Sequence, residues 1–243
     1  MQGISRRRWL AVALGGSLAA AASSAWAVHD GRAPLRDPDH IFELHTWSWQ
    51  EMKRRNVVMQ SYDYSCGAAA LATILQYYWN DPVTEKDILK VLFKTLTIGE
   101  IKDRTKNGMA ITDLRRVSVE MGYFSSIGTL PFDKLLEAKI PLIVPIHLEK
   151  SDHFVVYRGA ACGRVYLADP IRGNVRPTFA EFCGQWNKNA ILVVVKKNAT
   201  PPLHSRLSLS AEEIRLGETN RQFLQRELPQ PMPVPPSLPM SIH

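Results

Sequence analysis

The chain has 243 residues, of which 45% are apolar and 22% are charged, so it can bury a sizeable core and has the composition of a soluble globular protein. Its net charge is +7, from 30 basic and 23 acidic residues. The basic residues are spread along the chain without a stripe that alternates with aromatic residues, which gives no support to nucleic-acid binding.

The first 27 residues have the features of an export signal. Residues 6–8 are arginines, residues 11–22 form an apolar stretch, and Ala25-Trp26-Ala27 is a cleavage site of the A-x-A type. The apolar stretch is too short for a comfortable membrane span, so we expect no stable span in the mature chain, which would begin near Val28. Ser5-Arg-Arg-x-Trp-Leu also resembles a twin-arginine signal, and the ordinary secretory route stays open as the alternative.

Removal of this segment leaves 27 basic residues, a net charge of +4, and three cysteines, Cys66, Cys162 and Cys183. Export leads to an oxidising compartment, where an even number of cysteines would suggest a disulfide framework. An odd number leaves at least one thiol unpaired. A Cys162–Cys183 disulfide with Cys66 free is one arrangement, although the spacing does not demand it.

Residues 28–56 form an irregular, polar N-terminal extension, and residues 57–60 form a short strand or an extended lead into the segment that follows. Residues 68–79 favour a helix, because alanine and leucine are strong helix formers. Apolar residues recur there at i, i+3, i+4 and i+7: Leu71, Ile74, Leu75 and Tyr78.

Cys66 precedes this pattern, after a polar, turn-forming stretch at residues 61–65, and so lies at the first turn of the expected helix. The unpaired N–H groups and the dipole at a helix N-terminus favour the thiolate, the nucleophilic form of cysteine. Gly67 leaves room for a substrate backbone to come close. A buried core cysteine is the common alternative.

More helices follow in chain order. Thr84-Glu-Lys-Asp87 is typical of a capping box and starts a helix that runs to about Phe93. Residues 94–108 are polar with little periodicity and are expected to form a loop. Another helix begins at Thr112 and ends before Gly122, and a short strand follows at residues 123–125. A short helix begins at Pro131 and ends near residue 139.

The later part of the chain reads as strands, at residues 141–148, 153–158, 164–169 and 190–195, with one helix at residues 178–186. Helices first and strands later predict an α+β fold, with helices packed on an antiparallel sheet. Residues 198–243 contain a possible helix at 208–228 and a proline-rich, extended tail from Pro229.

A cysteine nucleophile needs a base, and the base needs a group that orients it. If residues 153–158 and 164–169 form a hairpin with a three-residue loop centred on Ala161, His153 lies directly opposite Asp169, and the carboxylate can fix the imidazole tautomer. The other histidines lack such a partner. Gln60 completes the set, because its side-chain amide and the Cys66 backbone N–H could form an oxyanion hole.

Three motifs resemble those of C39 peptidases, which are papain-like cysteine peptidases best known as the leader-cleaving domains of bacteriocin exporters. Gln60-x5-Cys66-Gly67 resembles their nucleophile motif, Asp152-His153-Phe-Val-Val their histidine motif, and Asp169-Pro170 with a nearby Gly173 their aspartate motif. The resemblance spans residues 57–197 and implies a papain-like fold. It also implies that Cys66 is the nucleophile, His153 the general base and acid, Asp169 its orienter and Gln60 the oxyanion donor.

Exporter domains often have aspartate before the cysteine, where this chain has Ser65, and this difference bears on activation. The chain has neither a long apolar span nor the G-x-x-x-x-G-K-[ST] motif of an ATPase, so it is not an exporter. It resembles the stand-alone periplasmic C39 peptidases of functional-amyloid (Fap) secretion systems. The resemblance therefore implies a periplasmic endopeptidase whose partner is a protein or peptide substrate, such as a secreted amyloid subunit or a secretion-system component.

Two other functions stay open at this point. A binding module would hold an unfolded export substrate in the same cleft with a vestigial cysteine, and a papain-like acyl transferase would pass the acyl group to an amine. We expect no cofactor, and a metalloenzyme is the weakest option because no H-x-x-x-H or C-x-x-C pair is present.

Overall fold

The computed structural model describes residues 32–36, 41–45, 47–148 and 151–215, in two compact units divided between Thr46 and Trp47. The expected signal segment at residues 1–27 and the tail from Pro229 lie outside the described residues. In the first unit, β1 (Arg32–Arg36) and β2 (Ile41–His45) form an antiparallel pair. The expectation of an irregular extension is wrong here, because the two segments form a backbone ladder from Arg32 opposite His45 to Arg36 opposite Ile41.

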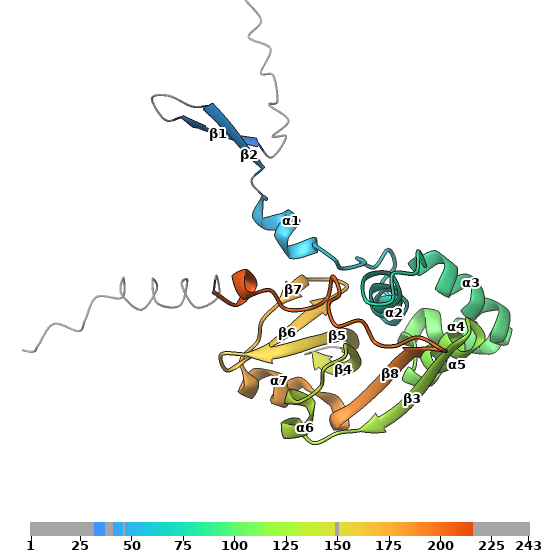
Figure 1. Ribbon diagram of the computed structural model, residues 1–243. Coiled ribbons are helices and arrows are strands. Elements are labelled where there is room, and N and C mark those ends of the chain that lie inside the picture. The colour runs from blue at the N-terminus through green and yellow to red at the C-terminus, as the bar shows by residue number, and fades with distance from the viewer. Residues whose placement is uncertain (1–31, 37–40, 46, 149–150, 216–243) are drawn as a thin grey trace, which may run out of the picture. The chain divides into compact units, whose positions relative to one another are not determined.

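The second unit contains a six-stranded sheet in which every strand pair is antiparallel, in the order β3-β8-β4-β5-β6-β7 (Figure 1). The strands are β3 (Tyr123–Thr129), β4 (Leu142–Leu148), β5 (Ser151–Ala161), β6 (Arg164–Asp169), β7 (Gly173–Val175) and β8 (Ala190–Lys196). The strands expected near residues 123, 141, 153, 164 and 190 are present, and β7 is an addition.

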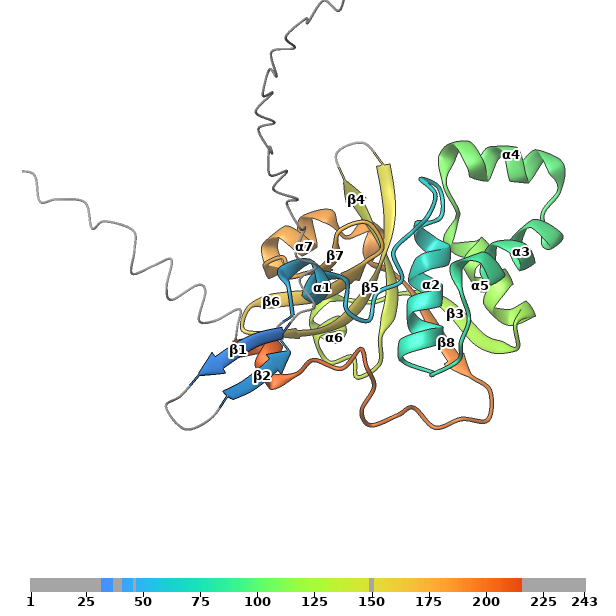
Figure 2. The same ribbon diagram turned by 90° about the horizontal axis from the view of Figure 1, so that it is seen from above.

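On one face of the sheet lies a group of four helices, α2 (Cys66–Tyr77), α3 (Glu85–Thr95), α4 (Ile98–Asn107) and α5 (Ile111–Glu120). In this group α2 and α5 contact the strands, α3 packs against α2 and α5, and α4 projects away from the sheet (Figures 1 and 2). Leu71, Ile74 and Leu75 of α2 are fully buried, and each contributes about 1.5–3 kcal/mol of hydrophobic stabilisation. They pack against sheet residues that share the same face, such as Val156 and Leu192.

The opposite face of the sheet has a second apolar cluster, formed with α6 (Phe132–Leu136) and α7 (Phe179–Gln185). Alternate residues of each strand supply it, because successive side chains of a strand point to opposite faces. Tyr157 and Leu167 belong to this cluster, while their neighbours Val156 and Ala168 belong to the first. Helices on an antiparallel sheet confirm the expected α+β class.

One helix lies where a loop is expected, and another helix is shorter than expected. Residues 98–107 form α4 and not a loop, because Thr97 and Glu100 make a reciprocal capping box and Gly108 ends the helix at φ 83°. None of its residues is buried, which is why the sequence shows no apolar stripe. The short helix α6 ends at Leu136, earlier than expected, and has Pro131 as its N-cap.

Residues before and after the sheet and helices also pack on the second unit. The helix α1 (Trp49–Arg54) begins with a capping box at Ser48 and contacts β7 through Asn174, whose side chain donates to the carbonyl of Arg55 at 2.9 Å. At the other end, Leu207 is buried, and the Arg206 N–H donates to the carbonyl of Tyr77 at 3.1 Å. Residues 211–215 are helical, and the rest of the helix expected at 208–228 lies outside the described residues.

Candidate active site

Cys66 is the first residue of α2, as the polar stretch before it predicts. Its N-cap, Ser65, makes no side-chain capping bond, so the first N–H groups of the helix have no hydroxyl partner there. Cys66 is buried and belongs to the first apolar cluster. Gly67 packs against α5, where an added Cβ would lie 2.9 Å from Leu114 Cδ2. Its small size therefore serves helix packing.

His153 and Asp169 are brought together by β5 and β6, with 2.8 Å between Nε2 and Oδ1. Both side chains are buried, His153 with 3% and Asp169 with 0% of its surface exposed. Nε2 is taken by Asp169, so Nδ1 is the ring nitrogen left for the nucleophile. The hydrogen bond fixes the tautomer and the plane of the imidazole.

The register that makes this pair differs from the expected one. The hairpin turns through two residues, Cys162 and Gly163, with φ 51° and 73°, and not through a three-residue loop centred on Ala161. The strands pair Ala161 with Arg164 and, beyond a bulge between Tyr157 and Gly159, Tyr157 with Leu167. The direct opposition of His153 and Asp169 is therefore wrong.

The bulge restores the shared face. Without it, the turn would place Asp169 directly opposite Val156. His153 lies three residues before Val156, an odd number, so its side chain would point to the other face of the sheet. Arg158 is the extra residue of the bulge, and it shifts the pairing by one, so that Asp169 falls opposite Val155. His153, two residues from Val155, then meets Asp169 diagonally, within reach of a ring and a carboxylate.

Asp169 accepts hydrogen bonds from other donors in addition to His153. Its Oδ1 also accepts from the backbone N–H of Ile171 at 2.8 Å and of Arg172 at 3.1 Å, and its Oδ2 accepts from Arg172 Nε at 2.5 Å. Burial alone would raise the pKa of Asp169, but the hydrogen bond and charge of His153, together with the bonds from Arg172, hold that pKa well below its usual value. The carboxylate is therefore ionised at neutral pH.

The environment of His153 favours its protonated form. Burial acts most strongly and would lower the pKa of the imidazole, but hydrogen bonds with Asp169 and with Cys66, and the negative charges of both, raise this pKa from 6.5 to about 9. Cys66 therefore lies close enough to the imidazole to act on its pKa. A thiolate and an imidazolium side by side are the resting form of a cysteine–histidine nucleophile.

Gln60 lies at the same end of the unit. Its backbone N–H donates to the carbonyl of Pro170, the residue after Asp169, at 2.9 Å. Its Nε2 donates to the carbonyl of Tyr62 at 2.9 Å, and its buried Oε1 has no hydrogen-bond partner among the residues that the structure describes. A side-chain amide has two N–H groups, so one remains for a ligand.

The structure explains why a glycine stands at position 173, close to Asp169 in the sequence. Its φ is 75°, and an added Cβ would lie 2.3 Å from the carbonyl oxygen of Lys53 in α1. Only glycine fits such a close backbone approach. The residue therefore allows α1 to pack beside the Asp169 turn.

Two residues that support this site are not identified by the sequence motifs. Arg172 holds Asp169, and Glu85 accepts hydrogen bonds from Ser61 and Ser65, the neighbours of Gln60 and Cys66. Their roles depend on long-range contacts, which periodicity does not reveal. For Glu85 the one available signal was its place at the start of a helix, next to the capping residue Thr84.

The remaining candidate groups do not join this site. His147 is exposed and pairs with Asp152 at 2.9 Å. In the part of the chain that the structure describes, all three cysteines are free thiols and no three His, Cys, Asp or Glu side chains cluster as metal ligands. Nor does any helix of that part have the length and apolar character needed to cross a bilayer.

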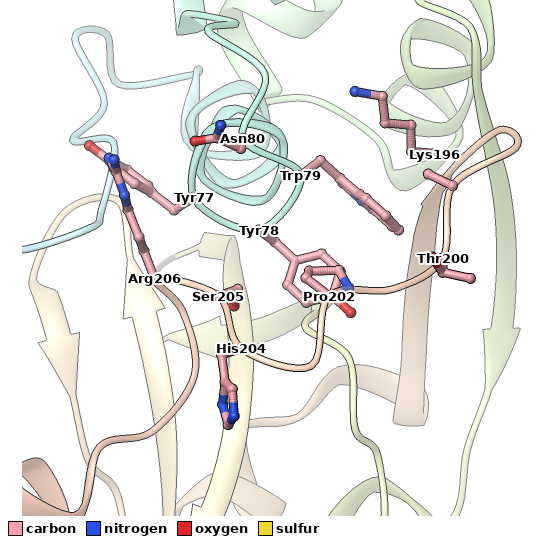
Figure 3. Close-up of a pocket in the computed structure, with 11 residues that line it drawn as sticks. Tyr77, Tyr78, Trp79, Asn80, Lys196, Thr200, Pro202, His204, Ser205 and Arg206 are labelled. Atoms are coloured by element: carbon pink, nitrogen blue, oxygen red, sulfur yellow. The ribbon is translucent and has the colours of Figure 1, made fainter.

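A pocket of about 530 Å³ lies at the opposite end of α2 from Cys66 (Figure 3). Its walls come from the C-terminal end of that helix, from Lys196 at the end of β8 and from residues 199–206. The helix is twelve residues long, so about 16 Å of helix separates this pocket from the thiol. It takes no part in the site around Cys66.

Comparisons with known proteins agree with the fold and the motifs. Residues 54–199 match the model of the peptidase C39 family. The "Probable functional amyloid protease FapD" of Pseudomonas fluorescens is 36% identical over 141 residues, which cover 58% of this chain and 61% of that protein. The protein of the same name from Pseudomonas aeruginosa is 31% identical over 147 residues, with 60% and 64% covered.

The match thus spans less than two thirds of the length of both relatives. Among solved structures, the peptidase domain of Streptococcus ComA, a bi-functional ABC transporter involved in a quorum-sensing pathway, aligns with a TM-score of 0.50 and 17% identity. The alignment covers 59% of this chain and all of that domain. At this identity the likeness concerns the fold, which is that of a papain-like peptidase domain.

Proposed function

Because this chain belongs to the peptidase C39 family, we propose that it is a cysteine endopeptidase with Cys66 as its nucleophile, His153 as general base and acid, and Asp169 as orienter. The observation that carries this proposal is the buried His153–Asp169 pair, with Cys66 beside the imidazole at the N-terminus of α2.

The reaction follows from these groups. The Cys66 thiolate attacks the carbonyl carbon of a peptide bond and forms a C–S bond, and the carbonyl electrons move onto oxygen. The Cys66 N–H and the free N–H of Gln60 stabilise that oxyanion. The C–N bond then breaks, and the leaving amine takes a proton from His153 Nδ1.

The second half regenerates the enzyme. His153 accepts a proton from water as the water oxygen attacks the thioester carbonyl. The C–S bond breaks, the acid product leaves, and the thiolate and imidazolium return to their resting state. Asp169 stays ionised throughout and stabilises the positive ring whenever it forms.

The substrate and its location are part of the proposal. The relatives named functional amyloid proteases suggest a secreted protein or amyloid precursor as substrate. The resemblance of the motifs to those of leader-cleaving C39 domains suggests a cut at a short site of small residues such as Gly-Gly. The signal-like residues 1–27 suggest that this takes place in the periplasm, after export by either route.

Mapping the N-termini of exported proteins tests the proposal. A strain that produces the wild-type chain is compared with one that produces Cys66→Ala, a variant that keeps the fold because it removes one sulfur atom. We expect one or a few exported proteins to lose a cleavage in the variant strain. Unchanged processing defeats the peptidase proposal, and a new amide-linked product after addition of an amine acceptor would identify an acyl transferase.

A further inference from the structure

One buried carboxylate ties both ends of the segment that joins Gln60 to Cys66. Ser61 follows Gln60, and its backbone N–H and hydroxyl donate to Glu85 at 3.0 Å and 2.6 Å. Ser65 precedes Cys66, and its hydroxyl donates to Glu85 at 2.5 Å. Glu85 is the first residue of α3, so the segment is anchored to a second helix.

A hydrogen-bonded turn inside this segment connects Ser65, which Glu85 holds, to the side-chain amide of Gln60. The Ser65 hydroxyl accepts from the Tyr62 N–H at 3.1 Å, and the Tyr62 carbonyl accepts from the Ser65 N–H at 3.1 Å. The same carbonyl accepts from Gln60 Nε2 at 2.9 Å. The direction of the Gln60 amide is therefore set by a turn that Ser65 and Glu85 hold in place.

Burial makes this arrangement stiff. Glu85 is 4% exposed and Ser65 is 0% exposed. Within residues 47–148 and 151–215, no lysine, arginine or histidine forms an ion pair with Glu85. Its oxygens are satisfied by the donors of Ser61 and Ser65, and the N-terminus of α3 favours its charge. A buried carboxylate is costly unless such bonds are kept, so movement of the segment is opposed.

We propose that Glu85 is a positioning residue for the oxyanion hole, which fixes the spacing between the Gln60 amide and the Cys66 backbone N–H. This inference rests on the proposed function. It separates two properties of the site, because Glu85 bonds the segment from Ser61 to Ser65 but forms no hydrogen bond or ion pair with the described residues His153 and Asp169. The nucleophile and the oxyanion hole are thus supported from different sides.

Two reactions of the same thiol distinguish these properties. Acylation by p-nitrophenyl acetate passes through a tetrahedral oxyanion: Cys66 sulfur bonds to the carbonyl carbon, and p-nitrophenolate leaves with the electron pair. Alkylation by iodoacetamide displaces iodide at a saturated carbon and forms no oxyanion. Both products are quantified at Cys66 by peptide mapping of the full chain, because Cys162 and Cys183 are exposed thiols.

We expect Glu85→Gln to slow acylation about tenfold and to change alkylation by less than about twofold, since loss of a whole oxyanion donor costs about 100–1,000-fold. Glu181→Gln is the control, because Glu181 is also an acidic residue in the first turn of a helix, α7, but is exposed and lies outside the site. It leaves both rates unchanged.

Coupling to Gln60 adds a second readout. In a Gln60→Ala background, Glu85→Gln loses most of its effect on acylation, because the amide it positions is gone. Ser61→Ala, which removes one donor to Glu85, gives a smaller effect of the same kind and serves if Glu85→Gln unfolds, as judged by circular dichroism.

Each other outcome overturns the inference. Equal slowing of both reactions indicates a general loss of structure, and unchanged acylation indicates that the oxyanion hole does not need Glu85. Failure of the proposed function looks different: in the wild-type chain, Cys66 would then react no faster than Cys162 and Cys183 with either reagent.

Discussion

His153 and Asp169 meet diagonally across β5 and β6, at 2.8 Å, because a single bulged residue corrects the register set by the hairpin turn. That residue, Arg158, also uses its side chain. Its guanidinium forms two bonds with the Glu213 carboxylate, at 2.8 and 2.9 Å, and donates to the carbonyl of Leu207 at 3.0 Å. The bulge thus sets the register and fastens the C-terminal segment.

These two roles are separable by Arg158→Ala. The substitution removes the fastening but keeps the extra backbone residue, so the His153–Asp169 pair stays in place. We expect the free energy of unfolding to fall by about 1–3 kcal/mol, because charge-assisted hydrogen bonds of a buried arginine are lost. Urea unfolding measures this change, and the rate of Cys66 alkylation stays at the wild-type value.

Deletion of Arg158 extends the test. Tyr157 and Gly159 already pair with the adjacent residues Leu167 and Tyr166, so removal of the residue between them leaves a regular ladder. We expect the deletion variant to lose the same stability as Arg158→Ala and to keep selective alkylation of Cys66. If the deletion alone abolishes that selectivity, the twist of the bulge matters in addition to the register.

The pH dependence of stability follows from the two buried groups. The pKa of His153 is raised from 6.5 to about 9, so its contribution to the free energy of unfolding is fully present below pH 6.5 and is lost as the pH rises through about 9. The pKa of Asp169 is lowered from 3.8, so its contribution is present above pH 3.8 and is lost as the pH falls below that value.

Urea unfolding of the wild-type chain and His153→Ala at a series of pH values measures the first effect. We expect the stability difference between the two proteins to shrink from pH 6.5 to about pH 9.5. The ring protons of His153, followed by NMR, titrate with a midpoint near 9. A midpoint near 6.5 would show that the imidazole lacks its negative partners.

Arg172 is expected to hold Asp169 in its ionised form. Its Nε donates to Asp169 Oδ2, and its side chain is 40% exposed, so solvent screens the pair. In Arg172→Gln the backbone N–H groups of Ile171 and Arg172 still bond Oδ1, and the pKa of Asp169 rises only part of the way toward 3.8.

The predicted result is an acid unfolding midpoint that moves upward by less than about one pH unit, as expected for a partly screened ion pair. Circular dichroism across an acid titration measures it. Arg172→Lys keeps the charge but not the planar guanidinium, so its midpoint lies between those of the other two proteins. An unshifted midpoint in Arg172→Gln would assign the stabilisation of Asp169 to His153 and the backbone alone.

The sequence predicted the parts of the site that depend on local chemistry. Cys66 was placed at a helix start because an apolar period begins just after a polar turn, and the structure begins α2 at that residue. The long-range parts were less accessible. Glu85 is twenty residues from Ser65, and nothing in the chemistry of α3 indicates that its first residue bonds the nucleophile segment.

Strand register is harder to predict from sequence, because it depends on turn length and on bulges. Cys162 has a positive φ, which is rare for a residue other than glycine, so the sequence favoured a longer loop than the observed two-residue turn. The helix α4 has no buried residue and so no apolar stripe, and only Thr97, Glu100 and Gly108 indicate its ends in the sequence.

Gly67 provides a test of how tightly the nucleophile helix is packed. An added Cβ at this position would lie 2.9 Å from Leu114 Cδ2 and 3.2 Å from Met109 Cε, closer than ordinary contacts. Gly67→Ala therefore requires the buried Leu114 side chain or α2 itself to shift, and we expect a loss of about 1–3 kcal/mol, as for other overpacked cores. A shift of α2 also moves Cys66, so its alkylation by iodoacetamide slows.

Leu114→Val is the matched second substitution, because it removes a methylene from the leucine that Gly67→Ala would meet. The double variant regains part of the stability lost by Gly67→Ala, and part of the alkylation rate, since the two side chains share one space. Additive losses in the double variant would contradict this packing argument and would leave room for a direct role of Gly67 in substrate approach.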